Sequence, residues 1–283
     1  MGIGYQRRDE EIIDYQLWQL KGIGRPIRGP RQGSLFPDKY ATCVGAAQTF
    51  GCYVEQPFPA LLSKSINIPV LNFGVAGAGP SFFIKNNSFL RYINNGRFAV
   101  VQVLSGRSVS NSLFKSNGGE MLTRLTDGVT KGAQPMYQDM LDMKDMELIA
   151  RISEETKRAW IEDTIRLLQA IRVPKVLLWL SKREPAYQPG FTKVIDFFGA
   201  FPQLVDEPML EAVKPHADYY VAHVSDEGLP QKLFSRHTGK PASIQMRKDL
   251  SGKEKKYNNY YPSPEMHKGV SEKLTELIEG AGL

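Results

Sequence analysis

Three short segments of the chain combine glycine with polar residues directly after an apolar run. They are GAAQTFG (residues 45–51), NFGVAG (72–77) and SGRS (105–108). Gln48 and Thr49 stand where a helix would begin, and free N–H groups at such a terminus favour anions. Arg107 is the residue type that best pairs with carboxylate, phosphate or sulfate. These residues predict a pocket for a small ligand with an anionic or acyl group.

An alternation of strands and helices must position these segments. Apolar runs predict strands at 40–44, 70–73, 98–104, 175–180 and 218–223. Periodic segments predict helices at 57–65, 82–94 (broken), 147–171, 208–213 and 263–279, the last capped by Ser263 with Pro264 in its first turn. We therefore expect an α/β fold, a three-layer α/β/α sandwich with a five-stranded parallel, flavodoxin-like sheet. Right-handed crossovers would bring the three segments to one sheet edge, where ligands bind.

The remaining segments are less regular. Residues 1–38 are rich in Arg, Gly and Pro, and predict an N-terminal arm with one short helix around residues 12–20. Residues 39–283 predict a single domain. Insertions are expected near 115–146, a Met-rich segment that suits a mobile lid, and near 226–256, a long polar loop.

Composition excludes several classes of function. The 283 residues are 42% hydrophobic and 23% charged, which is ordinary for a soluble globular protein. The net charge of +6 is scattered, apart from a denser stretch at 247–256, and favours a solvated surface over a polyanion site, with no nucleic-acid motif beside it. No run could span a membrane or serve as a secretory leader. We expect a cytoplasmic protein that binds neither nucleic acid nor membrane, and leave its oligomeric state open.

Metal and cofactor chemistry is not indicated. The two cysteines, Cys43 and Cys52, make no disulfide framework, and no Cys/His spacing suits a metal ion. We expect no metal and no cofactor.

The three segments and the C-terminal region resemble the SGNH (GDSL-type) hydrolase superfamily. That family has Gly-Asp-Ser after its first strand, Asn-x-Gly-x-x-Gly after its second, and Asp-x-x-His-Pro before its last helix. Here GAAQTFG, NFGVAG and NNYYP (258–262) stand at these places. The chain also resembles a group of bacterial proteins that carry GAAQTFG and YYPSPEMH, a kinship that implies no activity. The resemblance implies the SGNH fold over residues 40–283.

The departures from the family pattern fall on its catalytic residues. The family's serine corresponds to Ala47, its histidine to Tyr261, and its last-block aspartate to Asn258, while Arg107 replaces an oxyanion asparagine. Ala47 cannot attack a carbonyl, and a tyrosine with a pKa near 10 is a poor base at neutral pH. Ser-His-Asp chemistry is therefore not expected. The resemblance leaves Gly77 as the glycine whose N–H would stabilise developing negative charge.

Each remaining candidate residue has a structural alternative. Gly45 and Gly77 could line the ligand site or simply let helices approach the sheet, and Arg107 could bind an anion or pair with a local carboxylate. Ser108 is a nearby hydroxyl, and Asn111 could line the rim or close a turn. His267 is a candidate for catalysis, although a packing or capping role is favoured.

Two functions stay open at this point. The first is an SGNH-like protein with a substituted triad that binds a small anionic or acyl-bearing ligand and modifies it as a transferase or hydrolase by another mechanism, with Gln48, Thr49, Tyr261 and His267 as candidate catalytic residues. The second is a catalytically inactive binding or scaffolding partner. A polyanion-binding surface is a third alternative, supported by the basic balance alone.

Overall fold

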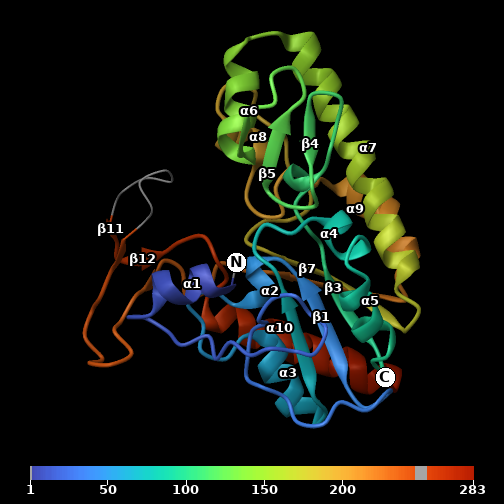
Figure 1. Cartoon of the computed structure of the whole chain (residues 1–283), viewed down its shortest axis with the longest axis vertical. Coiled ribbons are helices and arrows are strands. Elements are labelled where there is room, and N and C mark those ends of the chain that lie inside the picture. The colour runs from blue at the N-terminus through green and yellow to red at the C-terminus, as the bar shows by residue number, and fades with distance from the viewer. Residues whose placement is uncertain (1, 246–253) are drawn as a thin grey trace. The chain divides into compact units, whose positions relative to one another are not determined.

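The computed structural model describes residues 2–245 and 254–283 (Figure 1). It contains a five-stranded parallel sheet with the order β2-β1-β3-β7-β8. The strands are β1 (Ala41–Gly45), β2 (Val70–Gly74), β3 (Ala99–Gln102), β7 (Lys175–Ser181) and β8 (Tyr219–Val224). Counted along the chain, their order is 2-1-3-4-5, that of a doubly wound sheet. The predicted α/β class and its five parallel strands are confirmed.

Burial explains why these strands were visible in the sequence. β1, β2 and β3 are buried at every position, and six of the seven residues of β7 are buried. A strand covered on both faces has no polar alternation, so it reads as a continuous apolar run. The strand bounds differ from the predicted ones by at most two residues.

The chain groups into two compact units. Unit 1 comprises residues 1–76, 95–102 and 225–283, and unit 2 comprises residues 77–94 and 103–224. Both ends of the chain belong to unit 1. Residues 1–38 are thus in the same unit as β1, and the single domain from 39 to 283 stays a prediction.

In unit 1, α3 (Phe58–Ile66) and α10 (Pro264–Ala281) pack against each other. Ser263 begins α10 as predicted, because its Oγ accepts a hydrogen bond of 3.1 Å from the N–H of Met266. The buried positions of α10 recur at about one turn, which gives the helix one apolar face; they include Met266, Val270, Leu274 and Ile278.

The N-terminal residues of unit 1 are packed. The short helix is α1 (Gly2–Asp9), whereas residues 12–20, where it was expected, form no helix. Trp18 instead forms an antiparallel bridge with Ile27. The prediction of a short helix at 12–20 was wrong, because the apolar side chains there pack individually against the rest of the unit.

Arg28 accounts for much of this packing. It is 1% exposed, and its guanidinium donates to four backbone carbonyl oxygens, those of Tyr15 (2.6 Å), Gly29 (3.1 Å), Val54 (3.0 Å) and Glu55 (3.0 Å). A buried cation needs hydrogen-bond partners, and Nη1 and Nη2 of Arg28 have two carbonyl acceptors each. The described part of residues 1–38, whose Arg-rich composition predicted an arm, is therefore packed against the rest of unit 1.

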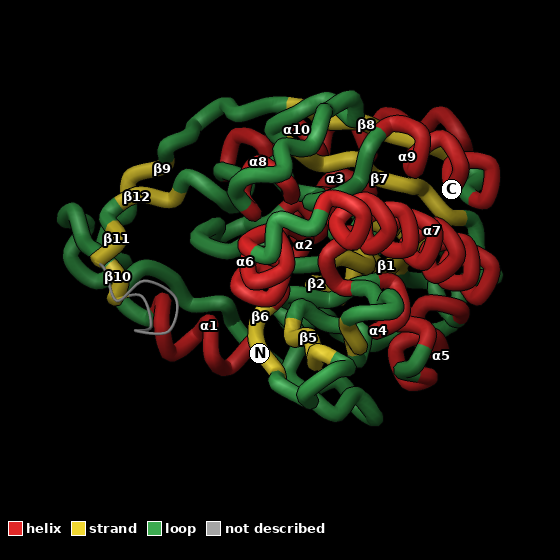
Figure 2. The backbone as a smooth tube through the Cα atoms, turned by 90° about the horizontal axis from the view of Figure 1, so that it is seen from above, coloured by secondary structure: helices red, strands yellow, loops and turns green. Residues whose placement is uncertain are grey.

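The part of unit 1 that follows β8 along the chain contains four described strands of two residues each. They are β9 (Gln231–Lys232), β10 (Ile244–Gln245), β11 (Glu254–Lys255) and β12 (Tyr257–Asn258). β9 pairs with β12 and β10 with β11, both antiparallel (Figure 2). The described part of the predicted loop at 226–256 therefore contains paired strands. Residues 246–253, with part of the basic stretch at 247–256, lie outside the described residues.

In unit 2, the longest helix is α7 (Met146–Ala170), which packs against α4 (Pro80–Ile84) and α9 (Glu207–Val213). Asp145 caps α7 by accepting a hydrogen bond of 3.0 Å from the N–H of Leu148. The broken helix expected at 82–94 is present as α4 and α5 (Asn87–Asn94).

The segment at 115–146 in unit 2 has its own secondary structure. Strands β4 (Phe114–Ser116), β5 (Met121–Arg124) and β6 (Thr130–Gly132) form an antiparallel sheet, followed by α6 (Ala133–Asp142). Together with α8 (Val194–Phe198) they enclose an aromatic and aliphatic core that includes Phe114, Leu122, Met136, Tyr137 and Phe197. Two 3-10 helices complete unit 2: η1 (Gly106–Ser108) and η2 (Lys214–His216).

Candidate functional site

The candidate residues fall into both units. Gly45, Gln48, Thr49, Tyr261 and His267 belong to unit 1. Gly77, Arg107, Ser108 and Asn111 belong to unit 2.

The turn after β1 is closed by a side chain that sequence reasoning missed. Gln102, at the end of β3, accepts hydrogen bonds through Oε1 from the N–H of Ala46 (3.0 Å) and the hydroxyl of Thr49 (2.7 Å). A Cβ on Gly45 would lie 2.5 Å from that same Oε1 and would clash with Thr49. Gly45 is therefore required for close packing. The available signal was the lone polar residue in the apolar run FAVVQVL.

Gln48 and Thr49 lie in α2 (Ala47–Phe50), a helix of four residues. The hydroxyl of Thr49 is engaged by Gln102 and is fully buried. Gln48 is 2% exposed, and its Oε1 has no hydrogen-bond partner among the described residues. Both side chains are thus internal in this structure.

Ala47, the position of the nucleophile in the resemblance, lies in an aromatic cluster in unit 1. It is 6% exposed and packs with Phe50, Tyr53, Tyr5 and Tyr261. The hydroxyl groups of Tyr5 and Tyr261 are 3.3 Å apart, and the Tyr53 and Tyr261 rings meet edge to face at 5.7 Å. Burial raises the pKa of Tyr261, so an even smaller fraction of it is ionised and able to accept a proton at neutral pH.

The buried Asp9 at the end of α1 ties this helix to the cluster through Tyr15. Asp9 is fully buried and accepts hydrogen bonds from Arg8 (2.6 and 2.7 Å) and from the hydroxyl of Tyr15 (2.7 Å). The Arg8 guanidinium also lies 4.6 Å from the centre of the Tyr5 ring. The bond from Tyr15 to Asp9 thereby fixes the end of α1 next to the cluster that contains Ala47, against which Tyr5 packs.

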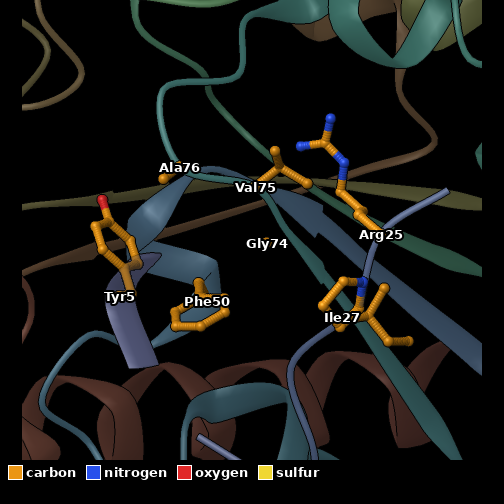
Figure 3. A pocket seen from close by; sticks show the side chains of 8 residues that line it. Tyr5, Arg25, Ile27, Phe50, Gly74, Val75 and Ala76 are labelled. Atoms are coloured by element: carbon orange, nitrogen blue, oxygen red, sulfur yellow. The ribbon is translucent and has the colours of Figure 1, made fainter. Parts of the chain in front are cut away.

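The described pocket nearest to these residues is small. Figure 3 shows Gly74 between the rings of Tyr5 and Phe50 on one side and the side chains of Arg25 and Ile27 on the other. Its volume of about 10 Å³ approximates the space that one water molecule needs. It cannot hold a substrate in this state.

His267 lies in the packing between α3 and α10. It is fully buried, its Nδ1 accepts a hydrogen bond of 3.0 Å from the N–H of Phe58, and its ring stacks on the Phe58 ring at 5.8 Å. These contacts agree with the favoured packing role.

In unit 2, three candidate residues meet around an acidic side chain that sequence reasoning missed. Arg107 in η1 donates from Nη2 to Oε2 of Glu120 at 2.9 Å. The Glu120 side chain lies against Gly77, because a Cβ there would be 2.8 Å from its Cγ. Ser108 donates its hydroxyl to the carbonyl oxygen of Gly77 at 3.1 Å. The structure thus brings Gly77, Arg107 and Ser108 together with Glu120.

Arg107 pairs with a local carboxylate, which is one of the two roles that the sequence left open for it. The pair remains accessible, since the Arg107 side chain is 17% and the Glu120 side chain 43% exposed. The Nε of Arg107 is buried and has no hydrogen-bond partner among the described residues. Nothing in the sequence linked positions 107 and 120, because their contact depends on the tertiary fold.

Asn111 closes a turn. Its Oδ1 accepts from the N–H groups of Leu113 (2.9 Å) and Phe114 (2.8 Å). Its Nδ2 donates to the hydroxyls of Tyr137 (3.2 Å) and Thr156 (3.0 Å). Among the described residues, its side chain makes no hydrogen bond to Gly77, Arg107, Ser108 or Glu120.

Two further features bear on chemistry. Among residues 2–245 and 254–283, no group of three or more His, Cys, Asp or Glu side chains is arranged to hold a metal ion. Within the same ranges no helix has both the length and the apolar character needed to cross a membrane.

Comparison with known proteins places the chain in a family. One family model, "Domain of unknown function (DUF6473)", matches residues 3–117 and 135–281. The chain belongs to the DUF6473 family. Its match omits residues 118–134, the segment that carries Glu120, β5 and β6. No curated protein matches the sequence.

Several solved structures are similar to this DUF6473 protein. A lipase, Lip_vut3 from a goat rumen metagenome, is 12% identical with a TM-score of 0.43, over 84% of this chain and 96% of the lipase. LAE5, an α/β hydrolase from the metagenome of Lake Arreo, Spain, is 12% identical with a TM-score of 0.42, over 86% of this chain and 95% of LAE5. BT4096, a gut microbial diltiazem-metabolizing enzyme, is 13% identical with a TM-score of 0.41, over 86% of this chain and 47% of BT4096. At these values the similarity carries no argument about activity.

Proposed function

We propose that this DUF6473 protein binds a small ligand with an anionic or acyl-bearing group at Arg107 and does not use serine-hydrolase chemistry. The observation that carries the proposal is the accessible Arg107–Glu120 pair beside Gly77. A guanidinium recognises carboxylate, phosphate and sulfate through paired N–H groups. An acid group of a ligand would bind the Arg107 N–H groups that the Glu120 carboxylate leaves unused.

The absence of serine chemistry is supported by the surroundings of Ala47. A triad needs a nucleophile and a base within hydrogen-bond reach. Ala47 offers no nucleophile, and the hydroxyl of Tyr261 faces that of Tyr5. Any modification of the ligand, as a transferase or hydrolase, would then rely on positioning and electrostatic stabilisation.

Two further points belong to this proposal. An SGNH-like three-layer architecture is supported by the order and spacing of the blocks at 45–51, 72–77 and 258–262. A cytoplasmic location is supported by Cys43 and Cys52, which are both buried and unpaired.

A thermal-shift screen tests the binding function. Small carboxylates, phosphates, sulfates and acyl conjugates are tested against the wild type, because a ligand that binds only the folded state raises its melting temperature. A true ligand should lose its effect with Arg107→Gln and keep it with Arg124→Gln. Arg124 is a fair control because it forms a similar surface pair with Asp127 at 2.9 Å in the same unit. A ligand whose shift survives Arg107→Gln would show that Arg107 is not its site.

A second candidate is a catalytically inactive scaffold that binds another protein. It is favoured by exposed apolar side chains on β5 and its turn: Met121 (55% exposed), Leu125 (54%) and Val129 (38%). If no small ligand depends on Arg107, the scaffold becomes the better proposal.

A further inference from the structure

We infer that the Arg107–Glu120 pair selects a small zwitterion, whose anionic group meets Arg107 and whose ammonium group meets Glu120. This rests on the proposed function, because it names the class of ligand for the same site. The ligand would resemble a free amino acid in carrying both charges a few atoms apart.

Unused hydrogen-bonding capacity on both partners supports the inference. A guanidinium has five N–H donors, yet the Arg107 side chain makes one hydrogen bond among the described residues, to Oε2 of Glu120. The Glu120 carboxylate likewise makes this one side-chain bond in the described part of the chain. Apart from the buried Nε of Arg107, each charge therefore has unused hydrogen-bonding capacity for a second, charge-assisted partner.

The balance of charge explains why a zwitterion is preferred over a simple anion. An anion that approaches Arg107 also approaches the Glu120 carboxylate, which repels it. A simple cation at Glu120 is repelled by Arg107 in the same way. A zwitterion aligned antiparallel to the pair meets an opposite charge at each end.

Backbone contacts hold the two charges in place. The Glu120 side chain lies against Gly77, which has a φ of +70° and no side chain to displace it. The carbonyl oxygen of Glu120 accepts from the N–H of Ala133 at 2.7 Å, and Ser105 Oγ accepts from the N–H of Arg107 at 3.3 Å. Such pre-organisation lowers the ordering cost of binding.

The selectivity would be a property of this chain more than of its family. Arg107 and Gly77 lie within the residues matched by the DUF6473 model, whereas Glu120 lies in the unmatched segment 118–134. We therefore expect family members without this segment to bind an anion at this place without the zwitterion preference.

Calorimetric or NMR titration of the full chain at low ionic strength tests the inference with three probes: glycine, acetate and methylammonium. Low salt is needed because screening weakens exposed charges. Glycine should bind at least about tenfold more tightly than acetate, which corresponds to one charge-assisted hydrogen bond. Methylammonium should bind no better than acetate.

Two variants separate this inference from the proposed function. Glu120→Gln should abolish the preference for glycine and strengthen the binding of acetate. Arg107→Gln should weaken the binding of glycine and of acetate. The matched controls are Asp127→Asn and Arg124→Gln, which alter the neighbouring exposed pair. Melting temperatures of all variants should stay close to that of the wild type, since surface pairs contribute little to stability.

The outcomes distinguish the two ideas. If acetate and glycine bind equally and both depend on Arg107, the zwitterion inference is overturned and the anion site stands. If binding of glycine does not depend on Arg107, both are wrong for this site. If glycine does not bind at up to about 100 mM, a very weak affinity limit, the inference is overturned, and the thermal-shift screen decides on the anion site.

Discussion

Ala47 and Tyr261 both belong to closely packed surroundings in unit 1. Ala47 is 6% exposed in a cluster against which Tyr5 and Tyr261 pack, and the hydroxyl of Tyr261 lies 3.3 Å from that of Tyr5. A nucleophile introduced at position 47 would lie in this packed cluster.

We therefore predict that Ala47→Ser does not create an esterase. The new hydroxyl would lie among aromatic rings, and the carboxylate beside them, that of Asp9, is already engaged by Arg8 and Tyr15. Hydrolysis of nitrophenyl acetate and butyrate by the wild type and the variant should equal the buffer blank. Saturable hydrolysis together with fluorophosphonate labelling of the wild type would contradict both this prediction and the proposed function.

His267 is predicted to act on stability. His267→Ala removes the acceptor of the Phe58 N–H and leaves that buried donor without a partner, a loss of about 1–3 kcal/mol in the free energy of unfolding. Urea denaturation followed by circular dichroism measures it. His237→Ala is the control, because His237 is exposed. The urea midpoint of this variant should equal that of the wild type. Equal urea midpoints for the two variants would show that His267 does not stabilise the fold.

At the scale of elements, β1, α2 and β3 approach one another most closely at Gly45, where a side chain would clash with Thr49 and Gln102. Gly45→Ala would force a methyl group against Thr49 and Gln102, and we expect it to destabilise unit 1 by about 1–3 kcal/mol. Gly33→Ala is the matched control, because a Cβ there meets nothing within 4 Å. The midpoints of urea unfolding should separate the two variants. A Gly45→Ala protein as stable as the control would mean that this turn can relax.

The elements also show what a sequence can and cannot reveal. Apolar runs revealed β1, β2, β3 and β7 because those strands are buried along nearly their whole length. Ser263 revealed the start of α10 because capping is a local interaction. The packed N-terminal segment was missed because its main anchor, Arg28, is satisfied by carbonyl groups at residues 15–55. Gln102 and Glu120 were missed for the same reason, since their partners are distant in sequence.

At the scale of the whole molecule, several tyrosines make stability sensitive to alkali. Burial raises the pKa of Tyr137 to about 12, and also raises the pKa values of Tyr15, Tyr53 and Tyr261. An unfolded tyrosine ionises near pH 10. Above that pH the unfolded chain releases protons that the folded chain retains, so rising pH favours unfolding.

We predict that the free energy of unfolding is constant with respect to these groups below pH 10 and falls between pH 10 and about 12. Each such tyrosine contributes a slope of about 1.4 kcal/mol per pH unit. Urea unfolding at a series of pH values measures the slope, and ultraviolet absorbance of tyrosinate should rise with unfolding. Early ionisation without loss of structure would contradict the prediction.

The division of unit 1 among residues 1–76, 95–102 and 225–283 has a consequence for how the protein is made. On the ribosome, every residue of unit 2 is synthesised before the last part of unit 1 emerges. Tyr5 cannot meet Tyr261 until then. A nascent chain that ends near residue 224 should therefore expose its first residues to protease, and release of the complete chain should protect them.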